Sequence, residues 1–355
     1  MSDEARVSTP REVELDAKIA FLRRADSYPE TRPGEPVAFV QTHMSCVFLT
    51  EHHAYKLKKP VRHSFLDFTT LEARRHYCQE ELRLNRRLAR EVYLAVLPLT
   101  QDRYGALAVD GRGEPVDWLV KMRRLPRALM LDQALTARTV GPEDVRRFAT
   151  VLARFYRHAA PLGVNAHEYR KRFEDGVIAN HRVLTEPRYG LSPAEVEQAT
   201  HEQRTFLDSH ADLLTRRVRQ RRIVEGHGDL RPEHVCLAPA PVFIDCLEFN
   251  PAFRVLDPAD ELAYLGMECE LLGAPFVGEV ALATYTAITE DAPPTPLVDF
   301  YKAYRATVRA RLSVLHLDDH ARREHARWVS RGQRYLGLAR RYGARAIMPA
   351  TDGAR

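Results

Sequence analysis

The spacing of apolar positions changes near residue 125. From roughly 36 to 125, short apolar runs alternate with polar residues, which is the period of strands, and only Leu71–Leu88 has the spacing of an amphipathic helix. A shorter helical stretch is expected at about 11–28. Beyond residue 125 helical spacing dominates, with helices expected near 142–160, 193–218, 258–272, 277–289 and 297–342. The last range is long enough for two helices, so the pattern predicts a mainly β part followed by a larger helical part.

Composition narrows the class of protein. A chain of 355 residues with 45% apolar content can form about two compact units. The charged N-terminus and the lack of a long apolar run predict neither a signal peptide nor a membrane span. The five cysteines have no C-x-x-C or zinc spacing and are expected to be reduced thiols of a cytoplasmic protein. No P-loop motif is present, which excludes that route to nucleotide binding.

Two aspartates, Asp229 and Asp245, each follow a short apolar run. Asp229 lies in His-Gly-Asp-Leu-Arg-Pro-Glu-His, residues 227–234, and Asp245 lies in Ile-Asp-Cys-Leu-Glu. The Ala-Pro-Ala-Pro turn at 238–241 would fold the second run back, so both carboxylates are expected on one side of a cleft. A phosphotransferase needs this pair, one to orient the attacking hydroxyl and one to hold magnesium on the nucleotide. A lone aspartate after a strand is more often a turn residue, but the combination favours a phosphotransferase.

With these motifs the chain resembles the aminoglycoside phosphotransferase and choline kinase-like family, whose catalytic loop reads H-G-D-x-x-x-x-N. The matching positions are His227, Gly228, Asp229, Asp245 and Glu248. His234 stands where the family has a metal-binding asparagine, and a neutral imidazole can also ligate a metal. Glu261 falls in a D-P-x-x-D-L-A-like element, whose acid braces the catalytic loop in the family.

The resemblance implies an α+β, protein-kinase-like two-lobe fold with a small, mainly β N-lobe and a larger, mainly α C-lobe. We expect an N-terminal helical extension at 1–35, a nucleotide-binding N-lobe at 36–125, a catalytic and substrate-binding C-lobe at 126–345 and a tail at 346–355. Details of the sequence resemble a bacterial aminoglycoside phosphotransferase-like subgroup. Some of its members carry a C-terminal P-loop ATPase domain, and we expect this chain to be without it.

Such a fold needs a lysine for the phosphates and a glutamate to hold it. Strand alternation places Ala54, Lys56 and Lys58 on one face of a strand. Lys56 is the first choice for the phosphates and Lys58 the second, and the alternative is a solvated edge strand with protective lysines. Glu81 lies in the apolar arc of the Leu71–Leu88 helix, where a carboxylate is costly unless it is paired, so it is the predicted partner.

Two further segments fit the same plan. Between the apolar runs of 39–50, Ser45 and neighbouring backbone N–H groups are expected to contact the nucleotide in place of a glycine-rich loop. The stretch 118–126 resembles the last strand of the N-lobe entering the hinge, where Met122 and Arg124 are expected to lie beside adenine.

The implied reaction transfers the γ-phosphoryl group of ATP or GTP to a hydroxyl of a small molecule, with Mg²⁺. Asp229 would be the base, Arg231 would contact the phosphoryl group or the substrate, and His227 would order the loop. The expected metal ligands are Asp245, His234 and Glu248.

The acceptor is not given by the sequence. Residues 299–345 hold twelve Lys or Arg against four acids, which favours an anionic or neutral acceptor over a cationic drug, although such residues are usually only a solvated face. Two alternatives remain: a nucleotide-binding regulatory pseudokinase, suggested by His234 and the glycine-free loop, and a nucleic-acid-binding protein, suggested only by the net charge of +5. We expect neither nucleic acid nor membrane as a partner, and the oligomeric state stays open.

Overall fold

The structure is a computed structural model that describes residues 13–63, 66–319 and 325–348. The expected extension and tail therefore lie partly outside the described residues. The chain forms two compact units. The first consists of Met1–Leu129 with Val242–Pro251, and the second of Met130–Pro241 with Ala252–Arg355.

The first unit is built on an antiparallel sheet of six strands in the order β1-β2-β3-β8-β6-β7. These strands are β1 (Ala38–Gln41), β2 (Ser45–Leu49), β3 (His53–Lys58), β6 (Tyr93–Gln101), β7 (Leu107–Val109) and β8 (Glu114–Arg123). The unit also contains the pair β4 (Arg62–His63) and β5 (Leu66–Asp67), the strand β11 (Val242–Phe243), and the helices α1 (Leu15–Leu22) and α2 (Leu71–Ala89).

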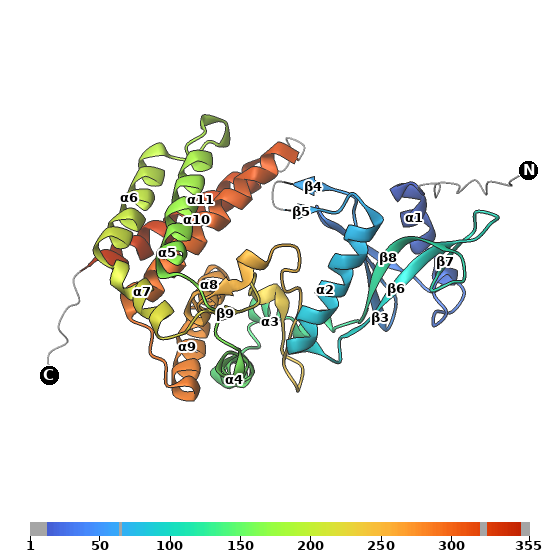
Figure 1. The fold of residues 1–355 in the computed structure, drawn as a ribbon, viewed down its shortest axis with the longest axis horizontal. Helices are drawn as coiled ribbons and strands as arrows, with labels where there is room; N and C mark the ends of the chain where they lie inside the picture. The colour runs from blue at the N-terminus through green and yellow to red at the C-terminus, as the bar shows by residue number, and fades with distance from the viewer. Residues whose placement is uncertain (1–12, 64–65, 320–324, 349–355) are drawn as a thin grey trace, which may run out of the picture. The chain divides into compact units, whose positions relative to one another are not determined.

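The two helices pack on opposite faces of this sheet because neighbouring residues of a strand point to opposite sides. Leu119 of β8 lies in the cluster that includes Leu22 of α1. The next residue, Val120, lies in the cluster that includes Cys78 of α2. In Figure 1, α2 runs along β6 and β8. The same alternation on β3 turns its two lysines toward α2.

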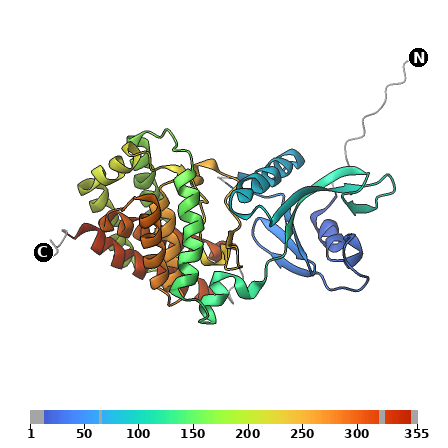
Figure 2. The same ribbon diagram turned by 90° about the horizontal axis from the view of Figure 1, so that it is seen from below.

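The second unit is mainly helical, and Figures 1 and 2 show its helices gathered into one bundle. Its helices are α3 (Leu131–Thr136), α4 (Pro142–His158), α5 (Ala166–Leu184), α6 (Pro193–Ser209), α7 (Ala211–Arg219), α8 (Pro258–Leu271), α9 (Phe276–Thr289), α10 (Thr295–Asp319) and α11 (His325–Ile347). Its short strands are β9 (Val224–Glu225), β10 (Val235–Cys236) and β12 (Val255–Leu256), and β9 pairs with β12.

Helix α8 lies at the centre of this bundle, and most of its side chains are buried. It meets α9 where two glycines face each other: a Cβ on Gly266 would lie 2.8 Å from the Cα of Gly278. Only glycine permits such a close approach of two backbones. The central position of α8 matters because this helix supports the His227–Asp229 loop.

The observed helices follow the expected ranges closely, with three differences, one of which is that the short helix α3 was not predicted. The expected helix at 193–218 is divided at His210 into α6 and α7. Helix α5 was not predicted, although Asn165 caps it and Tyr169, Phe173 and Val177 bury one face at a regular spacing of four residues. All five cysteines are buried and free. Among the described helices, none is long and apolar enough to cross a bilayer.

Candidate active site

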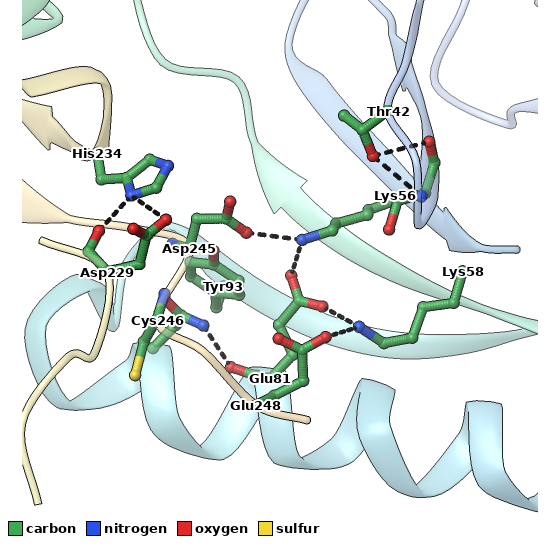
Figure 3. A network of polar contacts seen from close by, with 12 residues as sticks. Thr42, Lys56, Lys58, Glu81, Tyr93, Asp229, His234, Asp245, Cys246 and Glu248 are labelled. Atoms are coloured by element: carbon green, nitrogen blue, oxygen red, sulfur yellow. Dashed lines mark hydrogen bonds and ion pairs between the residues drawn. The ribbon is translucent and has the colours of Figure 1, made fainter. Parts of the chain in front are cut away.

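Lys56 of β3 lies between two carboxylates of the first unit. Its Nζ donates to Glu81 Oε1 on α2 at 2.9 Å and to Asp245 Oδ1 at 2.7 Å (Figure 3). The Lys56 side chain is 14% exposed, whereas that of Asp245 is 46% exposed. The expected pairing of Lys56 with Glu81 is therefore present in the structure, and it is joined by the aspartate predicted to hold a metal.

Lys58 lies two residues further along the same face and is fully buried. Its Nζ donates to Glu81 Oε2 at 2.6 Å and also to Glu248 Oε1. Glu81 therefore holds both lysines, one with each oxygen. Because Lys58 and the largely buried Glu248 neutralise each other, their position is that of a structural ion pair rather than of groups open to a nucleotide.

The charges of this cluster stabilise one another against burial. Burial acts to lower the pKa of the Lys56 ammonium, but Asp245 and Glu81 outweigh it and hold this pKa well above the usual value. Burial also acts to raise the pKa of Glu81, and here Lys56 and Lys58 prevail and lower it. The Lys56–Glu81 pair is thus charged on both sides throughout the neutral range.

The backbone at Asp245 is in the left-handed region, with φ of 62°. This conformation is uncommon for residues other than glycine, although aspartate tolerates it better than most. Two side chains hold the turn: the Asp245 N–H donates to Tyr93 Oη at 3.0 Å, and the Cys246 N–H donates to Asn85 Oδ1 at 2.9 Å. An uncommon backbone fixed in this way is typical of functional positions.

The catalytic-loop motif lies in the second unit, and Glu261 of α8 accepts hydrogen bonds from its backbone. The Glu261 carboxylate accepts the His227 N–H at 2.9 Å, the Gly228 N–H, and the Tyr156 hydroxyl at 2.7 Å. Burial raises the pKa of Glu261 despite these donors. Gly228 has φ of 88°, a value that glycine adopts more readily than other residues, which explains why the motif has glycine at this position.

Asp229 follows this turn with both carboxylate oxygens engaged. Tyr264 Oη donates to Oδ1 at 3.0 Å, and Arg231 Nε donates to Oδ2 at 3.0 Å. Burial acts to raise the pKa of Asp229, but Arg231, His234 and Arg309 outweigh it and hold the pKa well below the usual value. Asp229 is therefore an ionised, oriented acceptor of hydrogen bonds.

His227 and His234 support the same loop. The Asp229 N–H donates to His227 Nδ1 at 3.4 Å, and the buried His227 ring lies 5.9 Å from that of His234, centroid to centroid. His234 Nδ1 lies 2.8 Å from the main-chain oxygen of Asp229 (Figure 3). Because a carbonyl only accepts, Nδ1 donates to it, while Nε2 lies 3.3 Å from Arg231 Nη2, so its lone pair already faces this guanidinium.

The remaining residues predicted to contact the nucleotide differ in burial and in their hydrogen bonds. Ser45 is 4% exposed, and its N–H donates to Thr42 Oγ1 at 3.0 Å inside the turn between β1 and β2. Met122 on β8 pairs with Ala54 on β3. Arg124 is exposed, and its side chain donates to the main-chain oxygen of Thr50 at 2.7 Å. The Ser45 N–H is thus already engaged, whereas Met122 and Ala54 lie side by side on neighbouring strands.

The three predicted metal ligands differ in how available they are. Among the described residues there is no group of three or more His, Cys, Asp or Glu side chains that could hold a metal. Mg²⁺ in kinases is bound through one or two carboxylates together with the phosphates, so a preformed cage is not required. Asp245 fits this role because nearly half of its side chain is exposed. Glu248 fits it poorly because it is paired with Lys58.

Asp229 belongs to the second unit and Asp245 to the first. Their placement on one side of a cleft therefore stays a prediction.

Three supporting residues were not predicted. Tyr264 contacts Asp229, Tyr93 contacts the backbone of Asp245, and Asn85 contacts that of Cys246. The helical signal for two of them was available, because Tyr264 lies three residues after Glu261 and Asn85 four after Glu81, each on the same helix face. Tyr93 follows α2 in a strand, and no local pattern identifies it.

No family model matches the chain. An uncharacterized protein of Mycobacterium tuberculosis is 35% identical over 300 residues, which are 81% of this chain and 56% of that protein. An uncharacterized protein of Mycobacterium bovis matches to the same extent. The chain thus spans about half the length of the curated relatives it matches.

Solved structures identify the fold. A choline/ethanolamine kinase family protein from Mesorhizobium loti matches with a TM-score of 0.56 and 14% identity, over 94% of this chain and 99% of that one. The GDP complex of aminoglycoside 2'-phosphotransferase-IIIa matches with a TM-score of 0.51 and 13% identity, over 94% and 100%. The chain has the protein-kinase-like, two-lobe α+β fold of these proteins, so the predicted fold class is confirmed.

Proposed function

We propose that the protein is a phosphotransferase that moves the γ-phosphoryl group of ATP or GTP to a hydroxyl of a small molecule with the help of Mg²⁺. The observation that carries this proposal is the contrast between two aspartates. Asp229 is ionised and oriented by Tyr264 and Arg231, whereas Asp245 is half exposed beside the Lys56–Glu81 pair. Positioning and charge stabilisation, which these groups supply, account for most of the catalysis of phosphoryl transfer.

Lys56 is assigned to the nucleotide phosphates. It is the lysine with an exposed portion, and its ammonium is held by Glu81 while Asp245 lies at its other side. Bound Mg²⁺ would neutralise phosphate charge, and Asp245 would hold it. The GDP in the complex of the similar aminoglycoside 2'-phosphotransferase-IIIa supports nucleotide use, without deciding between ATP and GTP.

Asp229 is assigned to the acceptor hydroxyl. Its low pKa makes it a weak base in the ground state, which suits a loose transition state in which the hydroxyl needs orientation more than early deprotonation. Each carboxylate oxygen can accept a second hydrogen bond, so Asp229 can receive the hydroxyl while Tyr264 and Arg231 stay in place. Arg231 is assigned to the transferring phosphoryl group or the substrate, which a guanidinium contacts through charge-assisted hydrogen bonds.

The class of acceptor stays open. Many basic residues of α10 and α11 are paired with acids: Arg305 with Asp260, Arg309 with Glu268, Arg340 with Glu195, and Arg341 with Glu270. Their charge is therefore largely neutralised within the unit. The excess of basic residues in 299–345 consequently says less about the acceptor than their number suggests.

The proposal is tested by measuring Mg²⁺-dependent transfer from ATP and from GTP to sugars, amino alcohols and aminoglycosides, with Asp245→Ala as the control. Turnover with one acceptor, lost in Asp245→Ala, would support the kinase and name its acceptor class. Tight nucleotide binding without turnover on any acceptor would favour the regulatory pseudokinase. Absence of nucleotide binding would refute both.

A further inference from the structure

The second unit contains a cavity of about 140 Å³ that the proposed reaction does not use. Its lining includes Tyr156 and Arg157 of α4, Arg221 and Arg222 from the connection between α7 and β9, and Tyr285 of α9. No Asp or Glu is among the described residues that line it. Three arginines and two tyrosines therefore line one small space.

The positive charge of this cavity is incompletely neutralised. Among the residues that the structure describes, Arg157 and Arg221 form no ion pair, and Arg157 donates only to the main-chain oxygen of Ile288 at 3.3 Å. Arg222 Nε is buried and lies 3.7 Å from Asp291 Oδ2, beyond hydrogen-bond distance.

Asp291 offers Arg222 little compensation because it is already engaged. Its carboxylate accepts from Arg217 at 2.5 and 2.6 Å, and the Tyr285 hydroxyl donates to it at 2.6 Å. A buried donor without an acceptor is costly, so Arg222 favours an anion that enters the cavity.

The backbone brings two of the arginines to the cavity at the end of α7. The Arg221 N–H donates to Val218 O at 2.9 Å, and the Arg222 N–H donates to Arg217 O at 3.0 Å. Arg221 has φ of 56°, in the region favoured by glycine. This closed turn places Arg221 and Arg222 next to each other in the lining of the cavity, to which Arg157 of α4 also contributes.

Tyr156 connects this cavity to the catalytic loop. Its ring lines the cavity, and its hydroxyl donates to Glu261 Oε2 at 2.7 Å. The same carboxylate accepts the backbone N–H groups of His227 and Gly228. A change in the position of Tyr156 would therefore reach the loop that carries Asp229 through a single side chain.

We propose that this cavity is a regulatory site for a phosphate group, and that its occupancy stabilises the His227–Asp229 loop through Tyr156 and Glu261. Guanidinium groups bind phosphate through several charge-assisted hydrogen bonds. The cavity is smaller than the roughly 300–1,000 Å³ of sites that enclose whole drug-sized ligands, so it fits one phosphate group, either free or at the end of a small metabolite. The proposal does not depend on turnover.

Binding is tested by calorimetric titration of inorganic phosphate and, separately, glycerol phosphate, at about 150 mM salt to screen exposed charges. The titrations are made in a Lys56→Met background, which weakens binding at the proposed nucleotide site. Arg157→Gln and the double variant Arg157→Gln/Arg222→Gln should weaken binding by about tenfold or more. Arg146→Gln, on the same helix but outside the cavity lining, should leave it unchanged.

The comparison of the two ligands identifies the source: tighter binding of the ester indicates a metabolite, and equal binding indicates free phosphate. No measurable binding of either, or equal weakening by Arg146→Gln, would overturn the site. The single Arg157→Gln variant changes an exposed side chain, so it keeps the test valid if the double variant does not fold.

The connection to the loop is tested by amide hydrogen exchange at His227 and Gly228, with and without phosphate. Phosphate should slow exchange at both amides in the Lys56→Met background, whereas Tyr156→Phe, which keeps the ring and loses the hydroxyl, should bind phosphate without this protection. Protection that persists in Tyr156→Phe, or binding without protection in the parent, would refute the transmission. Neither result depends on nucleotide turnover, so the proposed kinase activity is judged separately.

Discussion

The two lysines of β3 share a face and a partner, yet their surroundings differ. Lys58 is fully buried between Glu81 and Glu248, whereas Lys56 is partly exposed between Glu81 and Asp245. Strand alternation in the sequence predicted that both would point the same way. It could not separate them, because the difference comes from Glu248 and Asp245, which lie about 190 positions away along the chain.

Matched substitutions of these lysines should separate function from stability. Lys56→Met should lower kcat/KM by about 100-fold or more, since it removes the cation assigned to the phosphates, with a small effect on unfolding. Lys58→Met should instead lower the free energy of unfolding by about 3–5 kcal/mol, because it removes a buried cation that pairs with both Glu81 and Glu248. Steady-state kinetics and denaturant unfolding of both variants check this. A large loss of kcat/KM in Lys58→Met together with a large loss of stability in Lys56→Met would mean that the two lysines have the opposite roles.

Glu81 should make stability depend on pH in the acid range. The pKa of Glu81 is lower in the folded protein than in the unfolded chain. Below the unfolded value of about 4.3 the unfolded chain therefore binds more protons, and the free energy of unfolding decreases as the pH is lowered. Glu81→Gln removes this contribution. The difference in free energy of unfolding between the parent and Glu81→Gln should therefore shrink by about 1–3 kcal/mol between about pH 7 and pH 3.

Denaturant unfolding at several pH values measures this difference. Glu80→Gln, a neighbouring and more exposed position on α2, is the matched control and should show a much smaller change. A difference for Glu81→Gln that stays constant over the whole pH range would mean that the carboxylate is not selectively stabilised by its lysines.

At the scale of elements, α8 organises the catalytic loop. Its first turn supplies Glu261 to the His227 and Gly228 amides, and one turn later Tyr264 reaches Asp229. The sequence identified Glu261 through the family motif and the helix through its apolar spacing. Tyr264 was missed because a tyrosine on a buried helix is usually a core residue, and its hydroxyl contact depends on the tertiary structure.

Glu261→Gln should loosen this support. A glutamine has one acceptor oxygen, so its amide group would face a backbone or tyrosine donor, which costs about 1–3 kcal/mol for each buried group left unsatisfied. We expect the free energy of unfolding to fall by that amount, together with faster amide exchange at Gly228. Tyr156→Phe, which removes one donor and keeps the carboxylate, should cost only about 1 kcal/mol. Equal stabilities of Glu261→Gln and the parent would contradict the supporting role.

At the scale of the whole molecule, the two units are not simple halves of the sequence. We expected the N-lobe to end at 125 and the C-lobe to continue without interruption to 345. The structure instead assigns Val242–Pro251 to the first unit. Val242 and Ile244 pack in the cluster with α2, and Leu247 and Phe249 pack with Leu66 and Phe68. Local apolar patterns predict such a strand but do not indicate whether it packs in the hydrophobic core of the first unit or of the second.

This assignment predicts how a nucleotide should protect the chain. If Lys56 and Asp245 bind the phosphates and metal, then Mg²⁺-nucleotide should slow hydrogen exchange in residues 54–58 and in 242–251, although about 190 positions separate them. Peptide-level exchange with and without nucleotide measures this. Protection of the second unit alone would place the nucleotide elsewhere.

The central claim is that Asp229 and Asp245 divide the work of phosphoryl transfer, and one experiment tests it most directly. It compares Mg²⁺-dependent turnover of ATP and GTP and nucleotide affinity in the parent, Asp229→Asn and Asp245→Asn, in the presence of the best acceptor. Asp229→Asn should lower kcat by about 100-fold or more with nucleotide affinity unchanged. Asp245→Asn should lose turnover together with the Mg²⁺-dependence of binding. Turnover in Asp229→Asn equal to the parent, or Mg²⁺-dependent binding that survives in Asp245→Asn, would contradict it.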